Sequence, residues 1–335
     1  MTGTGGARPV ALTCGEPAGI GAEIAVAACR ALGGEVAFFW IGDPRHLPSG
    51  TAWHPIAAPQ EAAAAPAGSL AVLPHPFAGG PARPGRPDPA HAQGVIDVIA
   101  RAVGLVREGQ AAALCTLPVS KRVLKEGAGF PFPGHTEYLA HLAGSPGAAV
   151  MMLAGAGLRV VPATVHLPLA AVPGALTGEV LDHAIRTTHA ALIADFGLPR
   201  PRIAVAGLNP HAGEGGTMGR EEETVIAPVL DRLRAAGLDI AGPLPADTMF
   251  HPAARARYDA AVCMYHDQAL IPLKTLDFAG GVNVTLGLPF VRTSPDHGTA
   301  FDIAGRGTAD PTSLIAALRL ARDMGARRAA RHGRA

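Results

Sequence analysis

The sequence has few cysteines, and they are scattered. Four stand among 335 residues, and none forms a Cys-x-x-Cys pair. This spacing argues against a disulfide framework and fits a reducing compartment. We therefore expect a cytoplasmic protein with free thiols, which are Cys14, Cys29, Cys115 and Cys263.

Net charge and long apolar runs are also lacking. The formal net charge is +1, so the chain has no broad basic field that would attract nucleic acid. No apolar run is long enough to span a bilayer, and the N-terminus lacks the charged-then-apolar signature of a secretion signal. We expect neither a nucleic-acid partner nor a membrane.

Apolar residues, in contrast, make up 48% of the chain, which is enough for a large core and suggests two lobes. The segment from Ile203 to Gly219 shows the basic unit of the fold. It opens as an apolar strand, continues as a glycine loop and leads into helical spacing from Glu221 to Ala236. Strand, loop and helix in this order predict an α/β protein that binds ligands at the carboxyl ends of its strands.

Three apolar runs lead to a histidine. His166 ends LRVVPATVH, His266 ends DAAVCMYH, and His211 lies in IAVAGLNPHAGEGGTMG. One such histidine alone would be interpreted as an ordinary packed or exposed side chain, but three in equivalent positions suggest a shared metal ion. Three imidazoles leave a coordination position open for substrate. They favour zinc, while cobalt, manganese and magnesium stay open.

Other polar residues gather in the loops. Asp247 stands in a proline-stiffened loop and is either a general base or a turn residue. Lys274 and Arg292 suit a phosphorylated or carboxylated substrate, although a single surface cation is the commoner role. Thr136 is a plausible N-cap of a helix whose free amides suit a phosphate. The segment 56–94 is rich in Ala, Pro and Gly, and SLAVL is the one strand expected there.

Seven motifs together resemble the 4-hydroxythreonine-4-phosphate dehydrogenase family of pyridoxal phosphate biosynthesis. They cover the chain in order from about Val10 to Met324. The motifs are GEPAGIGAE, PFPGHTEY, TVHLPL, GLNPHAGEGGTMGREE, PLPADTMF, CMYHDQALIPLK and GVNVTLGLPFVRTSPDHGTAFDIAG.

The resemblance implies a fold of the isocitrate/isopropylmalate dehydrogenase type, with two α/β/α lobes and the active site in the interlobe cleft. The first lobe would comprise residues 1–128 and 276–335 and bind the cofactor. The second, 129–275, would carry the metal-binding histidines and the dimer contacts. The family works as a homodimer in which each site draws on both subunits.

The resemblance also implies an activity. The family oxidises the C3 hydroxyl of 4-phosphooxy-L-threonine with NAD, for which NADP is the alternative here, and the product loses carbon dioxide to give 3-amino-2-oxopropyl phosphate. The implied ligands of one divalent metal are His166, His211 and His266. The implied substrate contacts are His135, Thr136, Lys274, Asn283 and Arg292. The adenosine-binding loop would include His297, Gly298, Thr299 and Asp302, and Asp247 is the candidate base.

Three alternatives stay open. Relatives of this family act on phosphothreonate or phosphoerythronate, and a difference of one small group rests on few pocket residues. A phosphate acyltransferase could share the architecture, because fold does not determine function. A non-catalytic protein that binds metal or phosphate is the third.

Overall fold

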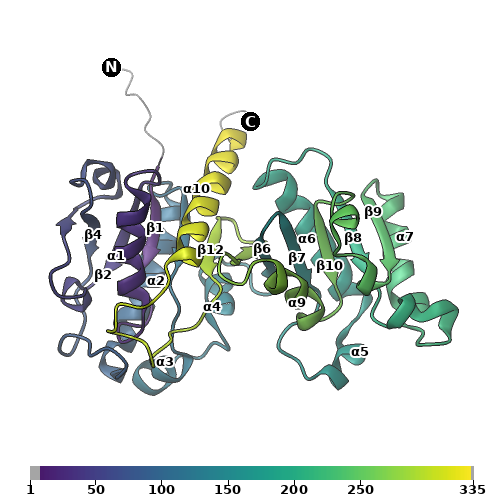
Figure 1. The fold of residues 1–335 in the computed structure, drawn as a ribbon, viewed down its shortest axis with the longest axis horizontal. Helices are drawn as coiled ribbons and strands as arrows, with labels where there is room; N and C mark the ends of the chain where they lie inside the picture. Colours follow the sequence, from purple (N-terminus) through teal and green to yellow (C-terminus); the bar gives the residue numbers. More distant parts are fainter. Residues whose placement is uncertain (1–7, 333–335) are drawn as a thin grey trace. The chain divides into compact units, whose positions relative to one another are not determined.

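The structure, a computed structural model, describes residues 8–332 and divides into two compact units. Unit 1 comprises the described residues of Met1–Ala149 and Leu288–Ala335, and unit 2 comprises Val150–Gly287. Figure 1 shows the elements of each unit in the colours of the sequence.

These bounds differ from the predicted ones at 128/129 and 275/276. Residues 129–149 belong to unit 1 because helix α4, His135–Leu142, is bound to helix α2, Ala92–Arg107. The Tyr138 hydroxyl donates to the Ile96 carbonyl at 3.4 Å, and Arg107 donates to the Leu142 carbonyl at 2.9 Å. Residues 276–287 belong to unit 2 because strand β11, Val282–Leu286, pairs with β6, Val150–Gly155.

Unit 1 contains a parallel sheet. Its strands follow the order β3-β4-β2-β1-β5-β12, and every recorded pair within it is parallel. Its central strands are continuously buried, as expected for a parallel sheet covered on both faces. The strands are β1 Val10–Thr13, β2 Phe38–Gly42, β3 Trp53–Pro55, β4 Leu70–Pro74, β5 Ala113–Thr116 and β12 Arg292–Pro295.

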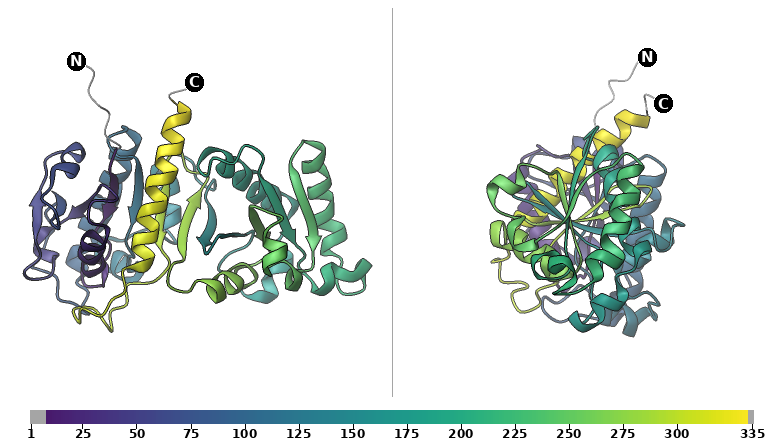
Figure 2. Two further views of the ribbon diagram at one scale, coloured as in Figure 1. Left: turned by 45° about the horizontal axis from the view of Figure 1, so that its top comes forward. Right: turned by 90° about the vertical axis from the view of Figure 1, so that its right-hand side faces the viewer.

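Helices of unit 1 pack on this sheet by apolar stripes. Helix α2 contacts β1, β2 and β5, and the last helix, α10, contacts β12 and β5. Helix α10 runs from Thr312 to His332, and alanine and arginine, which are good helix formers, are frequent in its last turns. Figure 2 shows it as the continuous yellow helix. The other helices are α1 Gly21–Leu32 and α3 Lys121–Ala128.

Unit 2 contains a mixed sheet in the order β11-β6-β7-β10-β8-β9. The pairs β11–β6 and β6–β7 are antiparallel, whereas β7, β10, β8 and β9 run parallel. These strands are β7 Leu158–Pro162, β8 Arg202–Ala206, β9 Asp239–Leu244 and β10 Ala260–Cys263. The helices are α5 Val172–Ala175, α6 Gly178–Ala194, α7 Ala227–Ala235, α8 Pro252–Arg255 and α9 His266–Leu276.

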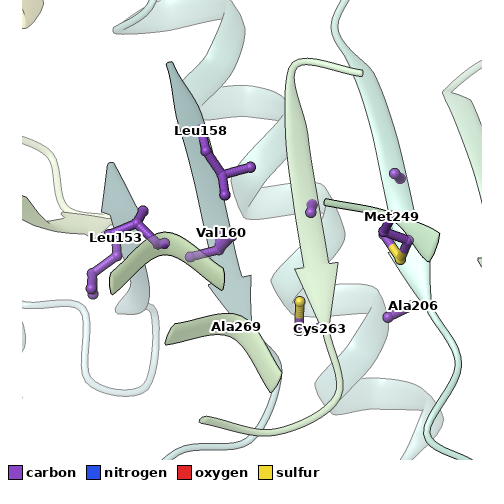
Figure 3. Packing of buried hydrophobic residues seen from close by; sticks show 10 residues of the cluster. Leu153, Leu158, Val160, Ala206, Met249, Cys263 and Ala269 are labelled. Carbon is purple, nitrogen blue, oxygen red and sulfur yellow. The ribbon is translucent and has the colours of Figure 1, made fainter. Parts of the chain in front are cut away.

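The core of unit 2 fixes helix α9 on the sheet. Ala269 and Leu273 of α9 are fully buried against side chains of the strands. Figure 3 shows most of this cluster, with labels on Leu153, Leu158, Val160, Ala206, Met249, Cys263 and Ala269. Because α9 begins at His266, its packing also determines where this histidine lies.

The segment 56–94 agrees with the sequence prediction in its one central strand. Leu70 to Leu73 of SLAVL lie in β4, most of the remaining residues form short 3-10 turns and loops around it, and Ala92 to Gly94 begin helix α2. Asp43 anchors part of this segment, because its buried carboxylate accepts from the Phe77 amide and pairs with Arg45 at 2.7 Å.

The fold is therefore of the mixed α/β class, as predicted. The predicted placement of the active site between two lobes stays a prediction. Throughout residues 8–332, no helix is both long and apolar enough to cross a membrane.

Two helical glycines should respond oppositely to alanine. A Cβ at Gly104 in α2 would meet nothing within 4 Å, whereas one at Gly127 in α3 would lie 2.0 Å from the Pro89 carbonyl oxygen. We expect Gly104→Ala to raise the free energy of unfolding by about 0.5–1 kcal/mol, because alanine loses less backbone entropy. Gly127→Ala should lower it by about 1–3 kcal/mol through overpacking. Denaturant unfolding measures both, and equal signs would contradict the close contact at Gly127.

Candidate active site at the strand ends

Hydrogen bonds join the carboxyl ends of three neighbouring strands in unit 2. Beyond β7, the Ala163 amide donates to the Cys263 carbonyl at 2.7 Å, and the Thr164 hydroxyl donates to the Met264 carbonyl at 2.7 Å. On the other side of β10, the Gln268 side chain donates to the Gly207 carbonyl at 2.8 Å. The segments that lead to the three predicted histidine ligands therefore start from one connected edge.

Two of these histidines lie together. The ring centroids of His166 and His266 are 5.7 Å apart. The Nδ1 of His266 lies 2.7 Å from Oδ1 of Asp267, an arrangement that orients the ring and leaves Nε2 for another partner. His166 is held in the left-handed region with φ of 54°, which is uncommon outside glycine. The pair is suited to supply two nitrogen ligands to one ion.

The third histidine is placed differently. His211 lies on the loop after β8, in a run of left-handed residues that continues through Gly215. Within residues 8–332, no three His, Cys, Asp or Glu side chains are grouped so as to hold a metal ion. The structure thus brings His166 and His266 together and leaves His211 on an adjoining loop.

The remaining predicted residues of unit 2 lie on nearby elements. Asp247 is exposed on a 3-10 turn, Ala246–Thr248, which contacts the His211 loop. Lys274 lies in α9, with Nζ 5.1 Å from the centroid of the Phe278 ring. Asn283 is half-buried in β11, opposite Leu153 of β6.

In unit 1, Arg292 is a buried cation at the start of β12. It is 5% exposed, and its Nε and one terminal nitrogen donate to the Thr116 hydroxyl at 3.1 and 2.7 Å. Burial lowers the pKa of Arg292 to about 10, so the guanidinium stays charged at neutral pH. A buried guanidinium with five donors suits a phosphate or carboxylate.

Helix α10 holds the strand that begins with Arg292. The Thr293 hydroxyl donates to the Ala317 carbonyl at 2.9 Å, and the Asp296 amide donates to the Ser313 hydroxyl at 3.0 Å. Near the other end of the helix, Arg328 donates to the Leu288 carbonyl at 3.2 Å. The guanidinium is therefore placed by contacts along much of α10.

His135 and Thr136 begin helix α4 of unit 1. The N-cap is Gly134, so Thr136 lies in the first turn and is not the N-cap that the sequence suggested. The Nε2 of His135 is buried without a hydrogen-bond partner among the described residues. Burial, together with the charge of Arg292, lowers the pKa of His135 well below its usual value. A neutral imidazole therefore lies near a buried guanidinium.

The predicted cofactor loop of unit 1 packs on the glycine turn at 15–21. The Ile20 amide donates to the Thr299 carbonyl at 3.1 Å, and Glu23 accepts from the amides of Gly305 and Gly307. His297, Gly298 and Asp302 lie on the same loop, half-buried or exposed. A cavity of about 400 Å³ is lined by residues of both segments, among them Gly19, Glu23, Gly305 and Gly307.

Sequence reasoning missed Glu222, which is buried beneath the His211 loop. A signal was present, because Glu222 precedes Ile226 by four residues and Val229 by seven. Positions at this spacing share one helix face, and both apolar residues are buried. A carboxylate on the buried face of a helix needs a polar partner, and here the partner is the loop.

Comparison with known proteins identifies the family. A family model described as pyridoxal phosphate biosynthetic protein PdxA matches residues 36–321. The chain belongs to the PdxA family. The match to PdxA includes the elements that carry His135, Arg292 and the three strand-end histidines.

Individual relatives agree with the PdxA assignment. The 4-hydroxythreonine-4-phosphate dehydrogenase of Paracoccus denitrificans (strain Pd 1222) is 65% identical over 326 residues, which cover 96% of this chain and 99% of the relative. A crystal structure of 4-hydroxythreonine-4-phosphate dehydrogenase from Klebsiella pneumoniae is 38% identical with a TM-score of 0.86, and the match covers 95% of this chain and 99% of that one.

A more distant structure extends the likeness of the fold beyond PdxA. The isocitrate dehydrogenase of Methylococcus capsulatus is 15% identical with a TM-score of 0.50, over 97% of this chain and 88% of that one. At this identity the likeness concerns the fold alone.

The charge of Arg292 should be measurable at His135. We expect Arg292→Gln to raise the pKa of His135 because a positive charge that opposes protonation is removed, while Arg122→Gln, an exposed control, should leave it unchanged. NMR titration of the imidazole measures this pKa, and an unchanged value in Arg292→Gln would contradict the coupling. Because the folded pKa lies below the unfolded value near 6.5, His135 should also lower the free energy of unfolding as the pH falls below about 6.5.

Proposed function

We propose that the chain is a metal-dependent 4-hydroxythreonine-4-phosphate dehydrogenase. In the proposed reaction, C3 of 4-phosphooxy-L-threonine loses a hydride to NAD or NADP and its hydroxyl loses a proton. The resulting β-keto acid then loses carbon dioxide to give 3-amino-2-oxopropyl phosphate. Relatives bearing this name over nearly the whole chain support the proposal. Among the features of the structure, the pairing of His166 with His266 carries it.

We propose that His166, His211 and His266 hold the metal ion, which is zinc on the basis of three nitrogen ligands, with cobalt, manganese or magnesium as alternatives. The residues fit such an ion in their chemistry and in the closeness of two of the three rings. The orientation of His266 by Asp267 also matches the usual support of a ligating histidine. When bound, the ion would act as a Lewis acid on the C3 oxygen.

The proposed substrate contacts are charged or polar groups suited to a phosphorylated amino acid. Arg292 supplies a buried guanidinium, and the neutral His135 offers a buried ring nitrogen without a partner among the described residues. Thr136 adds a hydroxyl in the first turn of α4, while Lys274 adds a cation and Asn283 an amide from unit 2. We assign the phosphate to the cations, because charge-assisted hydrogen bonds to anions are the strong ones.

We further propose that the loop with His297, Gly298, Thr299 and Asp302 binds the adenosine part of NAD or NADP. Its close packing on the glycine turn and the adjacent cavity of about 400 Å³ support this assignment. When bound, the nicotinamide would accept the hydride.

The proposed active form is a cytoplasmic homodimer whose sites draw on both subunits. Large apolar side chains are exposed on the segments that carry the histidines, and such groups often mark an interface. The four free cysteines suit a reducing cytoplasm. Light scattering that showed a monomer at working concentration would exclude the dimer. The exposed residues are Val165, Leu167, Leu169, Met218, Ile271, Leu276 and Phe278.

The assay that tests the function follows the absorbance of reduced nicotinamide. We expect it to rise when the metal-free protein receives 4-phosphooxy-L-threonine, NAD or NADP, and a divalent metal. His211→Ala should abolish turnover and leave no metal bound after purification, because the two remaining ligands hold the ion only weakly, whereas His183→Ala, an exposed histidine of α6, should change neither.

Metal analysis and circular dichroism of the same samples show whether metal is lost from a folded protein. Turnover of phosphothreonate or phosphoerythronate without turnover of the amino acid would favour the related dehydrogenases. No reduction of nicotinamide with any of the four metals would contradict the proposal.

Asp247 is the proposed general base, because its turn contacts the His211 loop. We expect Asp247→Asn to lower kcat by about 10²–10⁴-fold, the usual contribution of a positioned base, with a smaller change in KM. Asp239→Asn, at the opposite end of strand β9, is the control and should retain turnover. If Asp247→Asn keeps its turnover across the pH range, another group is the base.

A further inference from the structure

Glu222 is a buried carboxylate at the base of the loop that carries His211. Glu222 is only 4% exposed. One oxygen, Oε1, accepts from the backbone amides of Leu208 and Asn209 at 2.7 and 2.8 Å. The other, Oε2, accepts from the Asn209 side-chain amide at 3.0 Å. A buried carboxylate thus binds the first two residues after Gly207, where the loop leaves strand β8.

The loop is folded closely around this carboxylate. A Cβ at Gly207 would lie 3.0 Å from Oε1 of Glu222, and a Cβ at Gly213 would lie 2.7 Å from Oε2. The two glycines stand on either side of His211 in the chain. The backbone on both sides of His211 therefore approaches the same carboxylate so closely that a side chain at either glycine would crowd it.

The helix that presents Glu222 is locally irregular. Residues Glu222–Ile226 form a π-helical turn, in which the Ala227 amide donates to the Glu222 carbonyl. Turns of this kind occur inside helices mostly as single bulges and often at functional sites. The irregularity begins at Glu222 itself, which ties it to the residue that binds the loop.

The His211 loop needs such an anchor because its conformation is unfavourable. His211, Ala212 and Glu214 have φ of 53°, 51° and 41°. Residues other than glycine rarely adopt this conformation because it is strained, so the surrounding contacts must hold them there. Three hydrogen bonds to a charged group are contacts of sufficient strength.

We propose that Glu222 is a positioning residue for the metal site. It holds the base of the loop so that His211 can join His166 and His266 on one ion. This inference rests on the proposed metal site and adds a residue that acts through His211 without touching metal or substrate.

The test compares metal affinities of the metal-free dehydrogenase by calorimetry with Zn²⁺ and Co²⁺. Glu222→Gln keeps the shape of the side chain but replaces one acceptor by a donor that would face an amide. We expect its affinity to fall about 10- to 100-fold, the range for groups that support metal ligands. Glu223→Gln removes the same charge from the next residue, which is exposed and pairs with Arg220, and should bind metal as the unchanged protein does.

A double-mutant cycle separates positioning from general support of the fold. In a His211→Ala background, Glu222→Gln should cause little further loss of the remaining affinity, because its effect passes through the histidine. An equal loss in both backgrounds would overturn the proposal, as would unchanged affinity in Glu222→Gln.

Two further outcomes concern a variant that does not fold and a protein that binds no metal. If Glu222→Gln does not fold, Glu222→Asp keeps an acceptor and should bind metal more weakly than the unchanged protein. Affinity equal to that of the unchanged protein would overturn the role of Glu222. If the unchanged protein binds neither ion, the proposed metal function fails together with this inference. If the unchanged protein binds metal and the Glu222 variants bind it with the same affinity, this inference alone fails.

Discussion

The candidate site of unit 2 depends on hydrogen bonds that continue the sheet past the ends of its strands. The Ala163 amide donates to the carbonyl of Cys263, the last residue of β10, and the Thr164 hydroxyl donates to that of Met264. The Gln268 side chain donates to the carbonyl of Gly207 after β8. These bonds give three separate chain segments a common starting point. Without them, residues several positions beyond a strand would have no fixed relation to one another, however regular the sheet.

In each unit, a charged side chain is buried near predicted functional residues. Glu222 accepts from the backbone amides of Leu208 and Asn209, and the Arg292 side chain donates to the hydroxyl of Thr116. A buried ion acts more strongly on its neighbours than an exposed one, because the local dielectric is low. In unit 1 the charge of Arg292 favours an anionic ligand and an uncharged His135. In unit 2 the charge of Glu222 attracts the backbone amides at the base of the His211 loop.

Apolar periodicity predicted much of the fold. The apolar runs before His166, His211 and His266 form β7, β8 and β10, and the helical spacing from Glu221 to Ala236 forms the π-helical turn and helix α7, because local patterns determine which face is buried. The unit boundaries were less accessible. They depend on the pairing of β11 with β6 and on contacts between α4 and α2, which join segments distant in sequence.

The site was predictable in composition but only in part in geometry. The strand before His166 ends at Pro162, so the closeness of His166 to His266 comes from the bonds beyond the strands. The position of His211 depends on consecutive left-handed residues, and no residue pattern specifies these. Glu222 could have been noticed as a charge on an apolar helix face, yet its partners lie thirteen and fourteen residues earlier and become known only from the folded loop.

Helix α10 has a consequence for any shortened form of the chain. Ala317 and Ser313 of this helix accept hydrogen bonds from Thr293 in β12 and from Asp296 just after it. Arg328 donates to the carbonyl of Leu288, four residues before β12 begins. Removing residues from the carboxyl terminus would therefore disturb the position of the Arg292 guanidinium, although every proposed substrate and cofactor residue would still be present. Damage at the far end of the chain would then first weaken the proposed binding of phosphate by Arg292.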